Sequence, residues 1–284
     1  MPTTSPMPRL LPTRSSSAAW SYASRAVPMI TGADRRSARH RFYAAPATTP
    51  VELSLPPRLE SWDAKSHPAQ LGLTDFLDHA ELDLSAHLRA EPPWTLELAV
   101  GLPTTVPLLD HHDLDNYLYP LARRLGGRRL VAARATKAFG PRSTARLDTA
   151  RPSPPPDHLS VHHLRTTASA QTTAYKRQIH TQLVAAGASC PPPGTALSAV
   201  IGFRHSPRRN WLGLWKPTLD ALGPLIGEGS RPWSPRDGAI VELVLTSTVD
   251  PALGWDVEIC AAAVPIRPTR PSDRRAGGSG GLSG

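Results

Sequence analysis

The sequence predicts an α/β (α+β) fold in which one arrangement of elements occurs twice. Residues 94–149 and residues 196–264 each contain a strand, a loop, a proline-bearing helix that ends at glycine, and two further strands. At an offset of 97 residues, two prolines and two glycines coincide: Pro120 with Pro217, and Gly126 with Gly223. We therefore expect an internal duplication whose two halves, each a small mixed sheet with a packed helix, form a pseudo-dimer.

The first half, residues 51–150, begins with a predicted helix. Thr74 is a suitable N-cap, and apolar residues at helical spacing continue to about residue 90. Alternating apolar residues predict strands over 94–102, 130–137 and 143–149. Proline is tolerated in the first turn of a helix, so Pro120 predicts that the second helix begins near Asn116.

The rest of the chain divides into a connection, a second half and two ends. Residues 151–194 are expected to form a proline-rich linker and a helix over about 167–186. The second half, residues 195–267, is predicted to contain strands over 196–203, 239–249 and 256–264 and a helix over 210–223. Residues 1–50 are expected to form a disordered basic extension, and residues 268–284 a flexible tail. The extension is also similar in composition to an organellar targeting segment.

Composition limits the classes of function. The net charge of +9 belongs to the ends, because residues 1–50 hold seven Arg and one acid and residues 267–284 hold four Arg and one acid. The body is therefore neutral, and charge alone does not make it a nucleic-acid-binding domain. No apolar run reaches the ~18–20 residues that cross a bilayer, which favours a cytoplasmic protein. Two unpaired thiols are expected at Cys190 and Cys260, although a disulfide between them stays possible.

The most informative motif is Asp113-Leu114-Asp115-Asn116, directly before the proline-bearing helix. Residues two apart in an extended segment point to the same side, so both carboxylates could bind one hard cation. Acids near a helix N-terminus are also favoured by the helix dipole, and Asn is a good cap. The motif alone therefore fits either a metal site or a polar helix end.

These residues, together with part of the second half, resemble the RusA-type Holliday junction resolvases. That family of small homodimeric Mg²⁺-dependent endonucleases combines Asp-x-Asp-Asn, a lysine, a helix and a third acid before a strand. Here Asp113, Asp115 and Asn116 match the first motif. Lys216, followed by LDAL, matches the lysine position, and Asp237, directly before GAIVELVL, matches the third acid. The resemblance implies catalytic roles for Asp113, Asp115, Asp237 and Lys216, with the three aspartates as Mg²⁺ ligands.

The sequence departs from the family pattern because neither half holds the full set of residues. The second half has Asn210 and Leu212 where the aspartate pair belongs, and the first half has Tyr119 at the lysine position and no third acid. The halves could pool their residues into one site of an enzyme that acts on branched or structured DNA in recombination or repair. Alternatively, the chain is a non-catalytic nucleic-acid-binding or interaction protein with a degenerate nuclease fold. It would act as a monomeric pseudo-dimer or a homodimer.

Other side chains could contact a nucleic acid. The expected contacts are Asn116, Arg123, Arg124, Arg128 and Arg129. Cations near a helix C-terminus are equally explained by the helix dipole. Trp211 and Trp215, four residues apart on a helix, fit core packing better than base stacking.

Overall fold

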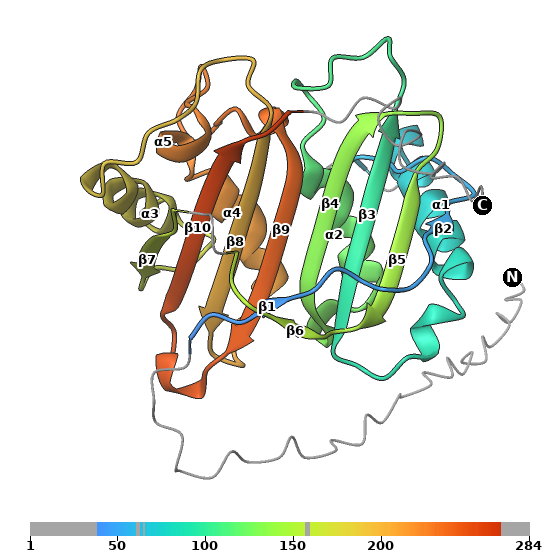
Figure 1. The fold of residues 1–284 in the computed structure, drawn as a ribbon, viewed down its shortest axis with the longest axis horizontal. Helices are drawn as coiled ribbons and strands as arrows, with labels where there is room; N and C mark the ends of the chain where they lie inside the picture. The colour runs from blue at the N-terminus through green and yellow to red at the C-terminus, as the bar shows by residue number, and fades with distance from the viewer. Residues whose placement is uncertain (1–38, 61–62, 65, 157–159, 268–284) are drawn as a thin grey trace, which may run out of the picture. The chain divides into compact units, whose positions relative to one another are not determined.

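One large mixed sheet dominates the computed structural model, which describes residues 39–60, 63–64, 66–156 and 160–267 (Figure 1). Its eight strands lie in the order β2-β5-β3-β4-β9-β8-β10-β7. In chain order the bounds are β2 Val51–Glu52, β3 Trp94–Leu102, β4 Leu130–Phe139, β5 Thr144–Thr149, β7 His162–Thr166, β8 Leu197–His205, β9 Ile240–Val249 and β10 Val257–Pro265. A separate two-stranded sheet pairs β1 (Phe42–Tyr43) with β6 (Pro152–Ser153). The predicted mixed α and β content is confirmed.

The pairing of the strands follows the same pattern on the two sides of the sheet centre. On one side β3 lies parallel to β4 and antiparallel to β5, which also pairs with β2. On the other side β8 lies parallel to β9 and antiparallel to β10, which also pairs with β7. The two sides join through β4 and β9, which are antiparallel.

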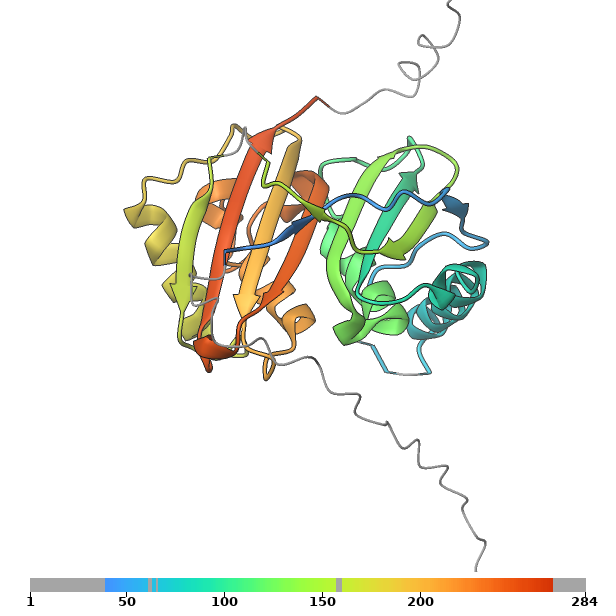
Figure 2. The same cartoon turned by 60° about the horizontal axis from the view of Figure 1, so that its bottom comes forward.

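The helices lie on one face of this sheet (Figures 1 and 2). Their bounds are α1 Pro68–Asp83, α2 Leu114–Leu125, α3 Thr173–Ala185, α4 Trp215–Leu219 and α5 Gly223–Ile226. Short 3₁₀ turns are η1 His87–Arg89, η2 Gly127–Arg129, η3 Trp211–Leu214, η4 Asp237–Ala239 and η5 Pro251–Leu253. Buried side chains of the helices and strands form one continuous apolar core. Trp211 and Trp215 belong to this core, with ring centroids 5.0 Å apart, which confirms the packing interpretation.

Two predicted helices differ from the structure. α1 begins at Pro68 rather than at Thr74, because the side chain of His67 accepts from the backbone N–H of Ala69 and proline suits the first helical position. The predicted helix over 210–223 is divided into η3, α4 and α5, and Gly223 begins α5 instead of ending a helix.

Pro120 lies inside α2 and not in its first turn, which corrects the predicted start near Asn116. A proline has no N–H, so it leaves the carbonyl four residues earlier without its helical partner. That carbonyl belongs to Asn116, and it accepts instead from the backbone N–H of Glu60 at 2.8 Å. The segment before α1 therefore satisfies the bond that the proline removes.

The predicted domain boundaries also need two corrections. Residues 39–50 are not a disordered extension: β1 crosses the face of the sheet opposite the helices (Figure 1), and Arg134 donates to the carbonyl of the buried Tyr43 at 2.8 Å. Residues 1–38 and 268–284 lie outside the described residues. The segment 151–194 is more than a linker, because β7 extends the sheet and α3 covers it.

The remaining expectations concern the cysteines and the membrane. Cys190 is exposed and Cys260 is buried, and both are free, as predicted. In the described part of the chain, no helix has the length and apolar character needed to cross a bilayer.

Candidate metal centre

The topology brings the two acidic segments to one end of the central strands. Asp113 follows β3 and is the N-cap residue of α2, while Asp237 begins the short turn that leads into β9. Because β3 is parallel to β4 and β4 is antiparallel to β9, the end of β3 and the start of β9 lie at the same end of the sheet. Asp113 and Asp237 are 124 positions apart in the chain, and this strand order brings them close together.

Three carboxylates converge at this end. One oxygen from each of Asp113, Asp115 and Asp237 lies within 4.8 Å of the other two. Oxygens bound to one Mg²⁺ at ~2.1 Å are about 3 Å apart when adjacent and about 4.2 Å apart when opposite. The three side chains thus have the donor type and nearly the spacing that a hard divalent cation requires, and small side-chain rotations would bring them to it.

Lys216 neutralises part of this negative charge. Its ammonium group lies 3.2 Å from the carboxylate of Asp237, 3.4 Å from that of Asp220 and 3.8 Å from that of Asp115. Burial by itself would lower the pKa of Lys216, but the surrounding aspartates outweigh burial and raise the pKa above its ordinary value. Lys216 is therefore a permanent cation beside the cluster.

Asp115 is the most buried of the three acids, with 3% of its surface exposed. Burial raises the pKa of its carboxyl to about 7; Lys216 opposes this shift, and the neighbouring carboxylates of Asp237 and Asp113 add to it. Burial likewise raises the pKa of Asp237. Carboxyl groups of this kind release protons when a cation binds, so proton and cation compete for the site.

Lys137 on β4 ties the two acidic segments together. Its ammonium group donates to the carbonyl of His112 at 2.7 Å and to the carbonyl of Gly238 at 2.6 Å. These carbonyls belong to the residues next to Asp113 and Asp237. Burial lowers the pKa of Lys137 to about 8, although nearby aspartates oppose the shift. The side chain is only 4% exposed, so it acts from beneath the carboxylates.

The acids of the DLDN motif lie at the N-terminus of α2. Asp113 is the N-cap residue of α2, but its side chain makes no capping hydrogen bond. Its carboxylate accepts instead from the side-chain amide of Asn116 at 3.1 Å. Asn116, expected to contact a nucleic acid, therefore orients Asp113. The side chain of Asp113 therefore does not cap α2, although Asp113 and Asp115 both lie at its N-terminus, where the helix dipole favours acids.

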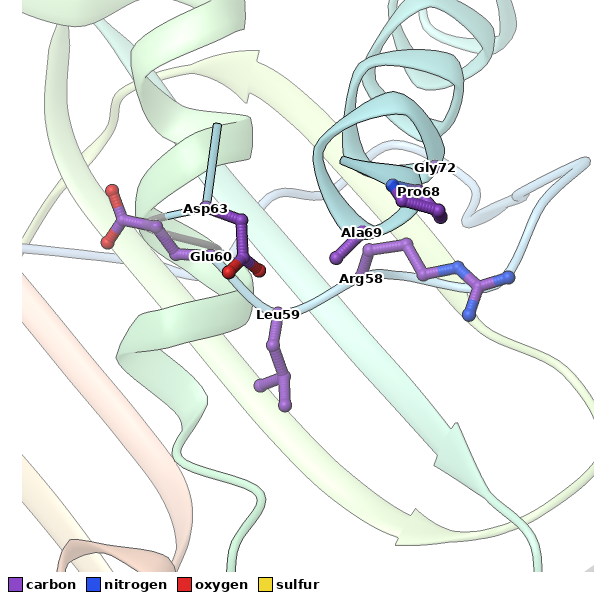
Figure 3. Close-up of a pocket in the computed structure, with 7 residues that line it drawn as sticks. All are labelled: Arg58, Leu59, Glu60, Asp63, Pro68, Ala69 and Gly72. Atoms are coloured by element: carbon purple, nitrogen blue, oxygen red, sulfur yellow. The ribbon is translucent and has the colours of Figure 1, made fainter. Parts of the chain in front are cut away.

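Depressions open on two sides of the carboxylates. One of about 500 Å³ is lined by Asp115, Lys216 and the start of α3, and another of about 560 Å³ is lined by Asp113 and Asp237. The first shares Glu60 with two further depressions beside α1 and α2. Figure 3 shows one of these, where the Arg58 side chain extends alongside Pro68 at the start of α1. Glu60 thus lies on the border of three separate depressions, one of which also contains Asp115 and Lys216.

None of the four arginines predicted to contact a nucleic acid lines the two depressions at the carboxylates. Arg123 and Arg124 line the depression beside α1 and α2, where Arg124 pairs with Asp78 and Glu81 at 2.6 and 2.5 Å. Arg128 and Arg129 follow α2 and precede β4, so they lie at the opposite end of β3 and β4 from Asp113. Arg129 lies over the ring of Trp94. Arg128 and Arg129 are therefore not close to the acidic motif, and their contact with a nucleic acid stays a prediction.

No protein-family model and no curated protein matches this chain. The geometry of the cluster therefore carries the functional argument.

Sequence reasoning missed three charged residues of the centre. Lys137 was included only as the end of a strand, although a lysine within an apolar, alternating strand is an available signal of a buried charge. Asp220 lies in the LDAL stretch and pairs with Lys176 at 2.6 Å, a contact between segments that spacing does not reveal. These residues extend the cluster into a network of alternating charges.

Proposed function

We propose that the chain is a Mg²⁺-dependent endonuclease for branched or structured DNA, a duplicated relative of the RusA-type resolvases. One observation carries the proposal: Asp113 and Asp115 from one half meet Asp237 and Lys216 from the other. These are the residue types that the resemblance assigns to the active site. They come from separate halves, and their meeting is what two halves that pool their residues into one site would require.

The strand registers support a duplication of one ancestral unit. The parallel ladder of β3 and β4 begins with the pair Trp94 and Leu130, and that of β8 and β9 begins with the pair Leu197 and Ile240. The corresponding residues of these two pairs are 103 and 110 positions apart in the chain. Each ladder then skips one residue at the same step, Val131 in the first and Val241 in the second. A shared irregularity at a fixed position is a feature that related halves inherit. The two halves would then form the equivalent of a dimer within one chain.

Each residue has a role that fits its position. Asp113, Asp115 and Asp237 would hold Mg²⁺, which supplies Lewis-acid polarisation of the phosphate and orients the attacking water. Hydrolysis forms one bond from the water oxygen to phosphorus and breaks one phosphorus–oxygen ester bond, while the water's proton passes to solvent and the departing oxygen takes one up. Lys216 would offset the charge on the departing oxygen, and Lys137 would hold the two acidic segments in register.

The depressions beside α1 and α2 would accommodate a DNA strand. Arg58 and Arg123 line them and can contact phosphates, whereas Glu60 marks the approach to the carboxylates. The described body would thus offer cations along the path and anions at the reaction centre. The carboxylates would repel the phosphates of a DNA strand, so the strand would reach the cluster only when a bound cation offsets their negative charge.

A second candidate function is binding of branched DNA without cleavage. Its support is the ammonium group of Lys216, which already offsets two of the three carboxylates and gives the cluster a structural use without any cation. In that case the fold and groove would be retained and the chemistry lost.

Cleavage of a labelled four-way junction with Mg²⁺ or Mn²⁺ tests the proposal. Asp113→Asn, Asp115→Asn and Asp237→Asn should each abolish cleavage while retaining binding, and Lys216→Ala should slow it. Asp256→Asn serves as the control and should cleave normally. It removes a carboxylate that pairs with Arg165 on β7, the strand next to β10. Binding without cleavage by the unaltered chain would instead select the second candidate.

A further inference from the structure

The duplication assigns a counterpart to every residue of the centre. α2 begins at Leu114 and η3 at Trp211, so the offset of 97 holds for the start of both helical segments and makes Asn210 the counterpart of Asp113. The same offset relates Asp115 to Leu212 and Lys216 to Tyr119. The offset of 110 between β4 and β9 relates Asp237 to Gly127. The four counterparts are Asn210, Leu212, Tyr119 and Gly127.

Two of the counterpart positions, Asn210 and Gly127, lie at the opposite end of the central strands. Asn210 follows β8 and Gly127 precedes β4, and the start of β4 lies with the end of β9 and hence with the end of β8. An intact duplication would therefore carry two centres, one at each end of the β4–β9 pair. Only one of these ends holds the three converging carboxylates in the described part of the chain.

Apolar packing has replaced the second centre. Leu212 is 3% exposed and belongs to the core, where no cation ligand can take its place without disrupting the packing. Tyr119 packs edge-on against Trp215, with ring centroids 6.2 Å apart. Gly127 has no side chain, and Asn210 offers only a neutral amide. None of the four positions, all of them described, carries a carboxylate.

We propose that each chain has a single reaction centre and makes one incision in a branched DNA instead of two paired incisions. This inference rests on the proposed function. One centre breaks one phosphodiester, and two strands related by the symmetry of a four-way junction need two centres presented together. The two halves of the chain supply both ends of the β4–β9 pair, but only one end holds the carboxylates. Such a chain would nick a single DNA strand. Its product is an interrupted strand in a branched molecule, which a second enzyme must process.

Titration with Mn²⁺ by calorimetry tests the single centre without relying on cleavage. The unaltered chain should bind Mn²⁺, and Asp115→Asn should remove all of this binding at the same metal concentrations. Asn210→Asp is the matched control, and it should leave the amount of bound Mn²⁺ unchanged. Retention of about half the bound Mn²⁺ in Asp115→Asn would overturn the single centre. Absence of Mn²⁺ binding by the unaltered chain would overturn the proposed function as well.

The number of incisions is then counted on a supercoiled plasmid with an inverted repeat that extrudes a cruciform. One incision relaxes the plasmid to a nicked circle, whereas paired incisions within one bound complex give a linear molecule directly. With one chain bound per junction, verified by native mass measurement, nicked circles should accumulate without linear product. Linear product that appears together with the first nicked circles would overturn the inference and leave the endonuclease proposal intact.

Discussion

Asp115→Asn should make the cation-free protein more stable at pH 8. Burial raises the pKa of this carboxyl from 3.8 to about 7, so at pH 8 the folded chain holds an anion that is better solvated when unfolded. A tenfold change in proton affinity corresponds to ~1.4 kcal/mol, which puts the full penalty at about 4 kcal/mol. Lys216 loses one of its partners in the variant, and we therefore expect a gain of about 1–3 kcal/mol.

The pH dependence follows from the direction of this shift. Between pH 3.8 and about 7 the folded state binds more protons at Asp115 than the unfolded state, so the contribution of this group to stability falls as pH rises through that window. The asparagine variant lacks this fall. Its advantage over the unaltered chain should therefore be small at pH 5 and large at pH 8.

Urea unfolding in the presence of a chelator, at pH 5 and at pH 8, measures the effect. Asp220→Asn is the control, because its carboxylate pairs with Lys176 at 2.6 Å and its loss should destabilise the fold by about 1–3 kcal/mol. Adding Mn²⁺ should stabilise the unaltered chain and not Asp115→Asn. If Asp115→Asn proved no more stable than the unaltered chain at pH 8, the argument from burial would be wrong.

Three further outcomes are expected. Lys137→Met removes the hydrogen bonds to the carbonyls of His112 and Gly238, and it should weaken Mn²⁺ binding at least tenfold in calorimetry. Lys137→Arg should restore part of the affinity. Equal affinity in all three proteins would contradict a positioning role for Lys137. Mn²⁺ affinity should rise as pH increases through about 7, because the cation displaces the proton of Asp115, and a flat profile between pH 6 and 8 would refute this competition. Tyr43→Ala should lower the free energy of unfolding by about 2–4 kcal/mol, because its side chain is buried against the sheet; a change below ~0.5 kcal/mol would show that β1 is dispensable.

Most of the sheet could be predicted from the sequence, and much of the helical layer could not. The strand predicted over 94–102 matches β3 at both ends, because alternation is a direct consequence of one buried face. The helix starts failed where a local contact decides the boundary, as at His67, or where a distant segment satisfies a freed carbonyl, as at Asn116. Such contacts depend on the fold and leave little trace in residue spacing.

The acids of the candidate centre could be predicted from the sequence, but the residues that position them could not. Resemblance to a family motif identified Asp113, Asp115 and Asp237, and their meeting follows from the strand order. Arg128 and Arg129 lie away from the acids because the 12 residues of α2 carry the chain ~18 Å along the helix axis. Lys137 was missed because its partners are backbone carbonyls, which no side-chain pattern reveals.

The hydrogen-bonded pair of β4 and β9 has a mechanical consequence for any ligand. The two halves are joined by main-chain bonds across the middle of one sheet, so they cannot hinge apart or close as separate domains do. The carboxylates of the first half and those of the second are held at a nearly fixed separation for the same reason. If the chain acts on branched DNA as proposed, recognition would depend on the shape that the DNA already has, and any bending needed to reach the centre would fall on the DNA. A junction with flexible arms should for that reason bind better than a rigid duplex of equal length.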